Sequence, residues 1–137
     1  MKKLMLFTLM LIPVLVQAEL LVIGNSSTAA ELSRRQIIDL YLGKVTVLPS
    51  GHGAELFEYG SGHTMNKEFY QAIIKRTENQ ILMNRQKQLI SGKFKSPVVA
   101  KDQADLVAKV AATPNAVGYI DSQYLNDSVT VLFKLDE

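Results

Sequence analysis

The chain has 137 residues, with 15 basic and 13 acidic side chains and no cysteine. The lack of cysteine excludes disulfides, thiolate metal sites and a lipid-modified cysteine. The charged residues form no basic cluster of the kind that binds nucleic acid, so no nucleic-acid partner is expected.

The first 18 residues have the layout of a secretory signal peptide. A basic start, Met1-Lys2-Lys3, precedes an apolar run, and the modest side chains up to Ala18 suit a cleavage site. The apolar run has about 13 residues, short of the roughly 20 that span a bilayer as a helix. We therefore expect cleavage after Ala18 and a periplasmic protein that is not membrane-embedded; a retained N-terminal anchor is the alternative.

Residues 19–137 are then predicted to form one domain of about 119 residues, long enough to bury a core. Two of the 15 basic residues, Lys2 and Lys3, lie in the leader, which leaves 13 basic against 13 acidic residues and a net charge near zero. The apparent basicity of the chain therefore belongs to the leader.

Hydrophobic periodicity and capping residues predict the elements of this domain. In chain order they are a strand over 19–24, a helix over 34–42, a brief extended piece over 45–48, a strand over 54–58, helices over 65–77, 80–90 and 103–112, and strands over 116–120 and 129–133. Ser33 and Asp102 are expected N-caps, and Gly43 is expected to end the first helix. Strands that alternate with helices predict an α/β fold, a mixed sheet with helices on both faces.

A candidate anion site lies between the second strand and the second helix, at Gly60, Ser61, Gly62, His63 and Thr64. The N–H groups at a helix start lack intrahelical acceptors and carry partial positive charge. Glycines let the backbone approach a ligand closely, and the hydroxyls and the imidazole add donors. The pattern predicts an oxyanion-binding loop. The alternative is an ordinary capped helix, with Ser61 or Thr64 as the cap.

A second polar group follows the first strand, at Asn25, Ser26 and Ser27. Because open α/β sheets bind ligands at the carboxyl ends of their strands, these side chains are expected to face the anion loop. Their alternative role is turn and cap chemistry. Arg34 or Arg35 would add positive charge at the same end of the sheet, or would lie on a solvated helix face.

Three segments resemble the phosphate-binding proteins of phosphate ABC transporters. Residues 32–44, L-S-R-R-Q-I-I-D-L-Y-L-G-K, resemble that family's L-S-x-x-Q-L-A-D-I-F-L-G-K, and residues 114–120, P-N-A-V-G-Y-I, resemble its P-G-A-I-G-Y-V. Residues 60–64 with Phe69 resemble its phosphate loop, D-G-S-G-T-T. The likeness is greatest to the short, secreted, single-domain relatives, because the full receptors have two lobes that close on phosphate.

The resemblance implies a type II periplasmic-binding-protein fold, or part of it, with phosphate or a similar oxyanion as ligand and an envelope transporter or sensor as partner. The chain departs from the family at Tyr59, which stands where the family has an aspartate; Glu58 would replace that acid only if it points inward. Counting back from Phe69 gives a second register, in which His63 takes the place of the family's serine and Asn66 that of an arginine. Both registers remain open.

Two functions follow from this reading. The first is a secreted solute-binding module for phosphate or a similar oxyanion, linked to ABC-type phosphate uptake or sensing. The alternative is a periplasmic protein-interaction module that has kept the fold and lost the ligand. An enzyme is not expected, and neither a catalytic residue nor a cofactor is predicted. His52 and His63 without cysteine make a poor zinc site, and Ser61 lacks the G-x-S-x-G context of a hydrolase nucleophile.

Overall fold

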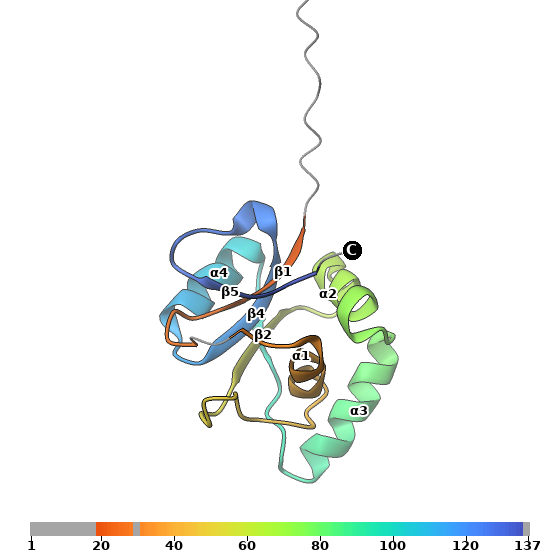
Figure 1. Ribbon diagram of the computed structural model, residues 1–137. Helices are drawn as coiled ribbons and strands as arrows, with labels where there is room; N and C mark the ends of the chain where they lie inside the picture. Colours follow the sequence, from red (N-terminus) through yellow and green to blue (C-terminus); the bar gives the residue numbers. More distant parts are fainter. Residues whose placement is uncertain (1–18, 29–30, 136–137) are drawn as a thin grey trace, which may run out of the picture.

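The computed structural model describes residues 19–28 and 31–135 (Figure 1). The predicted signal peptide, residues 1–18, lies outside this part of the chain. The strands are β1 (Leu20–Gly24), β2 (Glu55–Tyr59), β3 (Val98–Ala100), β4 (Ala116–Asp121) and β5 (Thr130–Lys134). The helices are α1 (Arg34–Tyr41), α2 (Thr64–Phe69), a π-helix (Tyr70–Ile74), α3 (Glu78–Ile90), α4 (Gln103–Ala112) and a 3-10 turn (Ser122–Tyr124).

The strands form one mixed sheet in the order β3-β2-β4-β1-β5. Strand β2 runs parallel to β3 and β4, whereas β1 runs antiparallel to β4 and β5. The carboxyl ends of β2, β3 and β4 therefore meet at one edge of the sheet. The carboxyl end of β1 lies at the opposite edge, where Gly24 pairs with Val117 at the start of β4.

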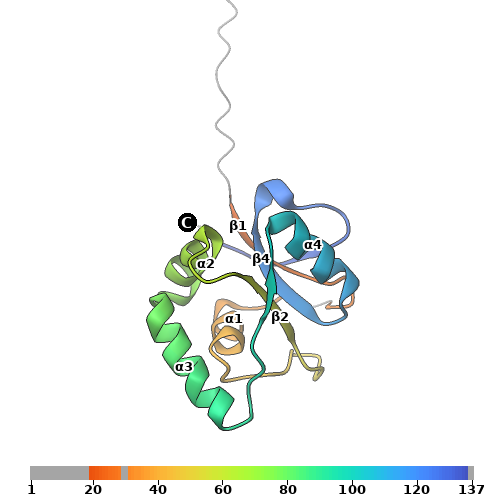
Figure 2. The same cartoon turned by 180° about the vertical axis from the view of Figure 1, so that it is seen from behind.

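Helices cover both faces of the sheet, as the sequence predicts. Helices α1, α2 and α3 gather on one side of the molecule and α4 on the other (Figures 1 and 2). Neighbouring residues of β4 show how each face is packed. The ring of Tyr119 stacks on Phe69 with centroids 3.9 Å apart. Gly118 faces α4 so closely that an added Cβ would lie 2.7 Å from a methyl carbon of Leu106.

Local signals identified most helix ends correctly. Ser33 and Asp102 cap α1 and α4, each accepting a hydrogen bond from a backbone N–H three residues on. Gly43 follows α1 with φ +76°, which favours glycine. No helix in the described ranges is both long and apolar enough to cross a membrane.

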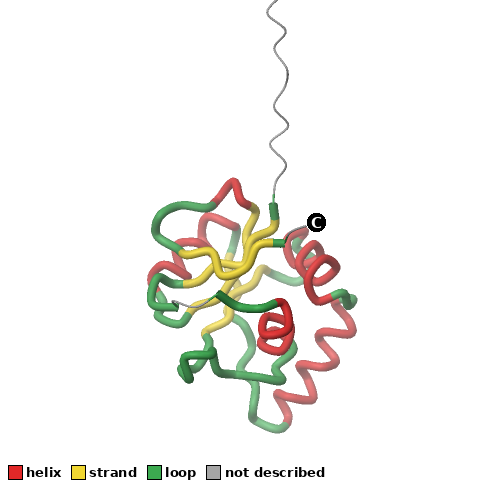
Figure 3. Tube along the Cα trace, viewed as in Figure 1, coloured by secondary structure: helices red, strands yellow, loops and turns green. Residues whose placement is uncertain are grey.

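Figure 3 shows where the helices, strands and loops lie along the chain. Three elements differ from the expectation. The predicted helix over 65–77 is α2 followed by the π-helix, and it ends at Lys75 in a left-handed conformation. Residues 45–48 form no strand; only Val47 makes an isolated bridge, with Gly53. Strand β3 was not predicted, because its three residues are too few to show a period.

Candidate functional site

The predicted anion loop lies at the carboxyl end of β2, and its backbone is open to solvent. A Cβ added at Gly60 or Gly62 would have no neighbour within 4 Å. Gly62 has φ +81°, which turns the chain sharply before α2. The N–H groups of Ser61 and Gly62 donate to no atom of the described residues. The loop therefore offers bare backbone donors at the carboxyl edge of parallel strands, where open α/β sheets bind ligands.

His63 is the N-cap of α2, so the helix is capped as in the alternative interpretation, but neither Ser61 nor Thr64 is the cap. Its Nδ1 accepts a hydrogen bond from the N–H of Met65 at 3.0 Å. Nδ1 must be unprotonated to accept, so in the neutral ring the proton is on Nε2, which is left to donate. The imidazole also stacks on Tyr59, with ring centroids 4.5 Å apart. This stack fixes the imidazole beside the loop.

The buried side chain of Asn66 holds the loop in place through hydrogen bonds. This structural role was not predicted from the sequence. Asn66 is 2% exposed. Its Oδ1 accepts from the N–H of Tyr59 at 3.1 Å and from the hydroxyl of Tyr119. Its Nδ2 donates to the carbonyls of Tyr59 at 2.8 Å and Gly60 at 3.0 Å. All of these bonds point inward, so Asn66 sets the loop's conformation and does not take the place of an anion-binding arginine.

A carboxylate lies beside the loop. The hydroxyl of Ser61 donates to Oε1 of Glu78 at 3.0 Å, and Glu78 is the first residue of α3. An anion that accepts a hydrogen bond from Ser61 must displace Glu78 and tolerate its charge. This contact reduces the contribution that the Ser61 hydroxyl can make to anion binding. The backbone N–H groups are therefore the main donors of the loop.

Glu58 does not face the loop, so it does not replace the family's aspartate. It is 9% exposed and forms an ion pair with Arg85, with Oε1 and Nη2 2.8 Å apart. Oε2 of Glu58 accepts from Nη1 of Arg85 at 3.2 Å and from the hydroxyl of Tyr70 at 3.3 Å. Burial alone would lower the pKa of Arg85, but the adjacent Glu58 raises it above its ordinary value. The carboxylate of Glu58 is thus held in the core by Arg85 and Tyr70 and does not reach the loop.

Asn25, Ser26 and Ser27 do not face the loop, because β1 runs antiparallel to β4 and carries them to the opposite edge of the sheet. Nδ2 of Asn25 donates to the carbonyls of Val110 and Ala111, at 2.9 and 3.0 Å, at the end of α4. Its Oδ1 accepts from the N–H and the hydroxyl of Ser27. Ser26 is exposed. Asn25 and Ser27 therefore have the alternative role given for them, that of turn and cap residues.

The two arginines of α1 are also engaged away from the loop. Arg34 donates to the carbonyls of Ala72 and Ile73 at the end of the π-helix. Arg35 pairs with Asp39 on the exposed face of its own helix, at 3.4 Å. Within residues 19–28 and 31–135, no three histidine or acidic side chains gather as a metal site.

A cluster of buried tyrosines lies beneath the loop. Because of these tyrosines, the free energy of unfolding depends on pH in the alkaline range. Burial, reinforced by nearby negative charges, raises the pKa of Tyr41, Tyr59 and Tyr119 well above the ordinary value, and that of Tyr70 to about 12. The fold therefore favours the neutral phenols. Their contribution to the free energy of unfolding is fully present below the unfolded pKa of about 10 and is lost as pH rises above it.

We expect the urea midpoint of unfolding to fall steeply once pH exceeds about 10, with tyrosinate absorbance rising in the same transition. Urea titrations followed by circular dichroism at a series of alkaline pH values check this. Since Tyr124 is the one exposed tyrosine among the five, tyrosinate absorbance from more than one tyrosine while the fold remains intact would contradict the buried hydroxyl network.

No protein-family model matches the chain, and no curated protein matches it in sequence. Several solved structures resemble it. One is a protein of Clostridium perfringens assigned as a phosphate ABC transporter substrate-binding protein, with phosphate bound: the TM-score is 0.68 at 18% identity, over 84% of this chain and 44% of that one.

Two further structures resemble this chain to a similar extent. An ABC-type phosphate transport receptor from Vibrio cholerae has a TM-score of 0.65 at 14% identity, over 84% of this chain and 45% of that one. PstS from Borrelia burgdorferi has a TM-score of 0.65 at 13% identity, over 84% of this chain and 46% of that one. The chain spans less than half the length of each of these proteins. It has the α/β fold of one lobe of the type II periplasmic-binding proteins.

Proposed function

We propose that this chain is a secreted solute-binding module that holds phosphate or a similar tetrahedral oxyanion on the loop from Gly60 to Thr64. Its place of action is the periplasm, with a transporter or sensor of the envelope as partner. Catalysis is not part of this function. The likeness in fold to phosphate receptors, one of which holds phosphate, supports the proposal but does not extend to the site itself.

The observation that carries the proposal is the open backbone of the loop. Gly60 and Gly62 leave room for an anion, and the N–H groups of Ser61 and Gly62 have no acceptor in the described part of the chain. Nε2 of His63 and the exposed hydroxyl of Thr64 lie on the same loop and supply further donors. Solvent reaches the loop, so each charge-assisted hydrogen bond contributes less than in a dry cleft.

Isothermal titration calorimetry of the purified protein with phosphate tests the proposal. We expect saturable binding with a dissociation constant of about 1 mM or below. In Gly60→Ala the new methyl group meets no protein atom, so the fold is kept while the approach of the anion is blocked. Loss of one or two charge-assisted hydrogen bonds should weaken binding about tenfold or more.

A second variant and a second anion test further whether the loop binds phosphate. Ser61→Ala combined with Thr64→Ala should weaken phosphate binding while far-UV circular dichroism stays unchanged. Since Glu58 is held by Arg85, Glu78 is the carboxylate left beside the loop. It can accept a hydrogen bond from hydrogenphosphate but not from sulfate, so sulfate should bind more weakly than phosphate. Phosphate affinity that is unchanged in both variants would place the site elsewhere.

The second candidate function is a protein-interaction module that has kept the fold without the ligand. The contact between Ser61 and Glu78 favours it, because this contact occupies a loop hydroxyl and places a carboxylate where an anion would lie. Absence of heat and of thermal stabilisation at millimolar phosphate would overturn the solute-binding function and leave this one.

A further inference from the structure

A separate feature of the molecule is a hollow between α3 and the segment formed by α2 and the π-helix. It has a volume of about 610 Å³, within the range of sites for small molecules. Its charged lining consists of Lys67, Lys75, Arg76 and Glu78. A neighbouring hollow of about 460 Å³ shares Lys75 and Arg76 and continues along α3 to Lys87. Because the two hollows share Lys75, Arg76 and Gln80, we take them together as the α3 groove.

The α3 groove is strongly cationic on a chain whose formal net charge is only +2. Lys67, Lys75, Arg76 and Lys87 line it, and Glu78 is its single acidic residue. Within residues 19–28 and 31–135, none of these four cations forms an ion pair with a carboxylate. The lining therefore has an excess of three positive charges that the described protein does not neutralise.

An unusual backbone places two of these cations together. The π-helix ends at Lys75, which has φ 60° and ψ 40°, and the N–H of Arg76 closes the turn on the carbonyl of Tyr70 at 3.2 Å. Lysine rarely adopts the left-handed conformation, and π-helical turns and strained residues occur often at functional sites. The turn puts Lys75 and Arg76 where the two hollows meet.

The length of the groove indicates the shape of its ligand. Along α3 it is lined by Gln80, Asn84 and Lys87, which lie on one face of the helix at spacings of four and three residues. Seven residues of α-helix extend about 10 Å. A single tetrahedral anion is shorter than this span, whereas a chain of phosphate groups matches it.

We propose that the α3 groove binds an extended anion with two or more phosphate groups, either a free oligophosphate or the headgroup of a lipid with two phosphates. Lys75 and Arg76 hold the central phosphate group, with Lys67 toward one end and Lys87 toward the other. This site adjoins the loop through Glu78, which lines the groove and accepts a hydrogen bond from Ser61. Its four cations lie outside the loop, and the inference does not depend on the proposed function.

Calorimetric titration with tripolyphosphate, at low and at physiological salt, tests the proposal. We expect tripolyphosphate to bind at least about tenfold more tightly than inorganic phosphate, since it contacts more of the cations, and to weaken as salt rises. Replacing Lys75 and Arg76 together by glutamine should lower its affinity about tenfold or more. Gly60→Ala should leave tripolyphosphate binding unchanged, which separates this site from the loop.

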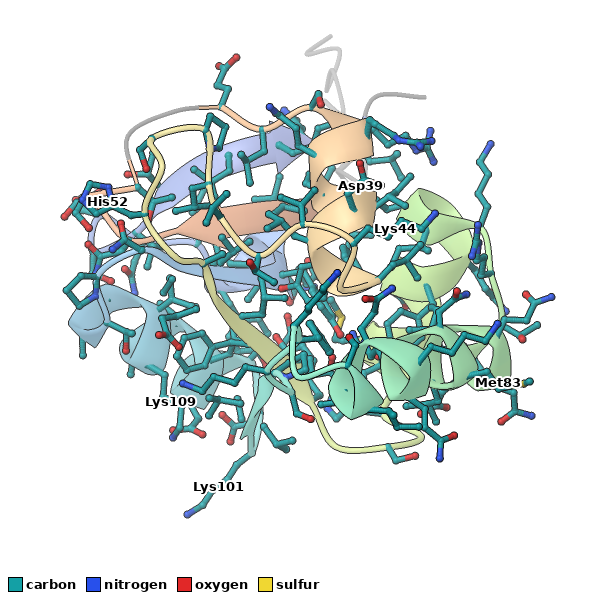
Figure 4. The ribbon with its side chains drawn as sticks, turned by 90° about the horizontal axis from the view of Figure 1, so that it is seen from below. Asp39, Lys44, His52, Met83, Lys101 and Lys109 are labelled. Atoms are coloured by element: carbon teal, nitrogen blue, oxygen red, sulfur yellow. The ribbon has the colours of Figure 1, made fainter. Side chains whose placement is uncertain are left out.

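The matched control removes the same charge elsewhere, by Lys44→Gln with Lys101→Gln. Neither residue lines the groove, and Figure 4 shows Lys101 extending away from the molecule. An equal loss of affinity in this control, or equal affinities for phosphate and tripolyphosphate, would overturn the proposal. Cardiolipin vesicles distinguish the two sources of the ligand. If the protein binds these vesicles, tripolyphosphate displaces it, and the variant with Lys75 and Arg76 replaced no longer binds, the ligand is the lipid headgroup. If the protein does not bind the vesicles, the ligand is the free oligophosphate.

Discussion

Replacing Arg85 by methionine is expected to lower the free energy of unfolding by about 3–5 kcal/mol, because it leaves the buried carboxylate of Glu58 without its partner. Nε of Arg85 also donates to the carbonyl of Tyr41 at 2.8 Å, at the end of α1. The single substitution therefore loses an ion pair and a cap together. Urea denaturation followed by circular dichroism measures the change.

The double variant Glu58→Leu with Arg85→Met is the matched comparison. It removes both charges and replaces them with apolar side chains, so it should be clearly more stable than Arg85→Met alone. If the double variant is as unstable as the single one, the cost comes from lost packing and not from the unpaired carboxylate. A loss below about 1 kcal/mol in Arg85→Met would mean that the pair is exposed, as surface ion pairs have that value.

Replacing Asn66 by alanine is expected to cost about 3 kcal/mol or more, because three buried polar groups lose their partners at once. These groups are the N–H of Tyr59, the carbonyl of Tyr59 and the hydroxyl of Tyr119. The loop should also loosen, so its amide hydrogens should exchange with solvent faster than in the unaltered protein. Thermal unfolding and hydrogen exchange measure the two effects.

Asn84→Ala is the control for this prediction. Asn84 is also a helical asparagine, but its side chain makes one exposed hydrogen bond, to the carbonyl of Gln80 at 3.1 Å. Its replacement should change stability by no more than about 0.5 kcal/mol. Equal effects at Asn66 and Asn84 would show that the inward bonds of Asn66 do not hold the loop.

The parts of the fold that were predicted from sequence are those that depend on near neighbours in the chain. The caps Ser33 and Asp102 bond three residues ahead, and Gly43 supplies the positive φ that ends α1. Such signals are complete within one helical turn. They identified the α-helices, the strands β1, β2, β4 and β5, and hence the α/β class.

The parts that were missed depend on partners distant in sequence or on features without a period. The direction of β1 is set by its pairing with β4, about a hundred residues away, and that direction separates Asn25 from the loop. Strand β3 has only three residues, and Val98 and Val99 are exposed. The π-helix begins with the same apolar spacing as an α-helix, so hydrophobic periodicity does not distinguish them.

The candidate site shows the same limit. The glycines and hydroxyls of the loop were recognisable from their order in the chain. The choice of Arg85, 27 residues away, as the partner of Glu58 was not, because many basic residues compete for that role in the sequence. The inward bonds of Asn66 and the contact of Glu78 with Ser61 likewise form only once α2 and α3 are placed on the sheet.

The most direct test of oxyanion binding is a phosphate titration of the ¹⁵N-labelled protein, followed by the NMR shifts of its backbone amides. If the loop binds the anion, we expect saturable shifts at Ser61, Gly62 and Thr64, none at Asn25 or Ser27 on the opposite edge of the sheet, and loss of the loop shifts in Gly60→Ala. A loop that does not shift at millimolar phosphate, or shifts confined to the opposite edge or to the α3 groove, would contradict oxyanion binding by the loop.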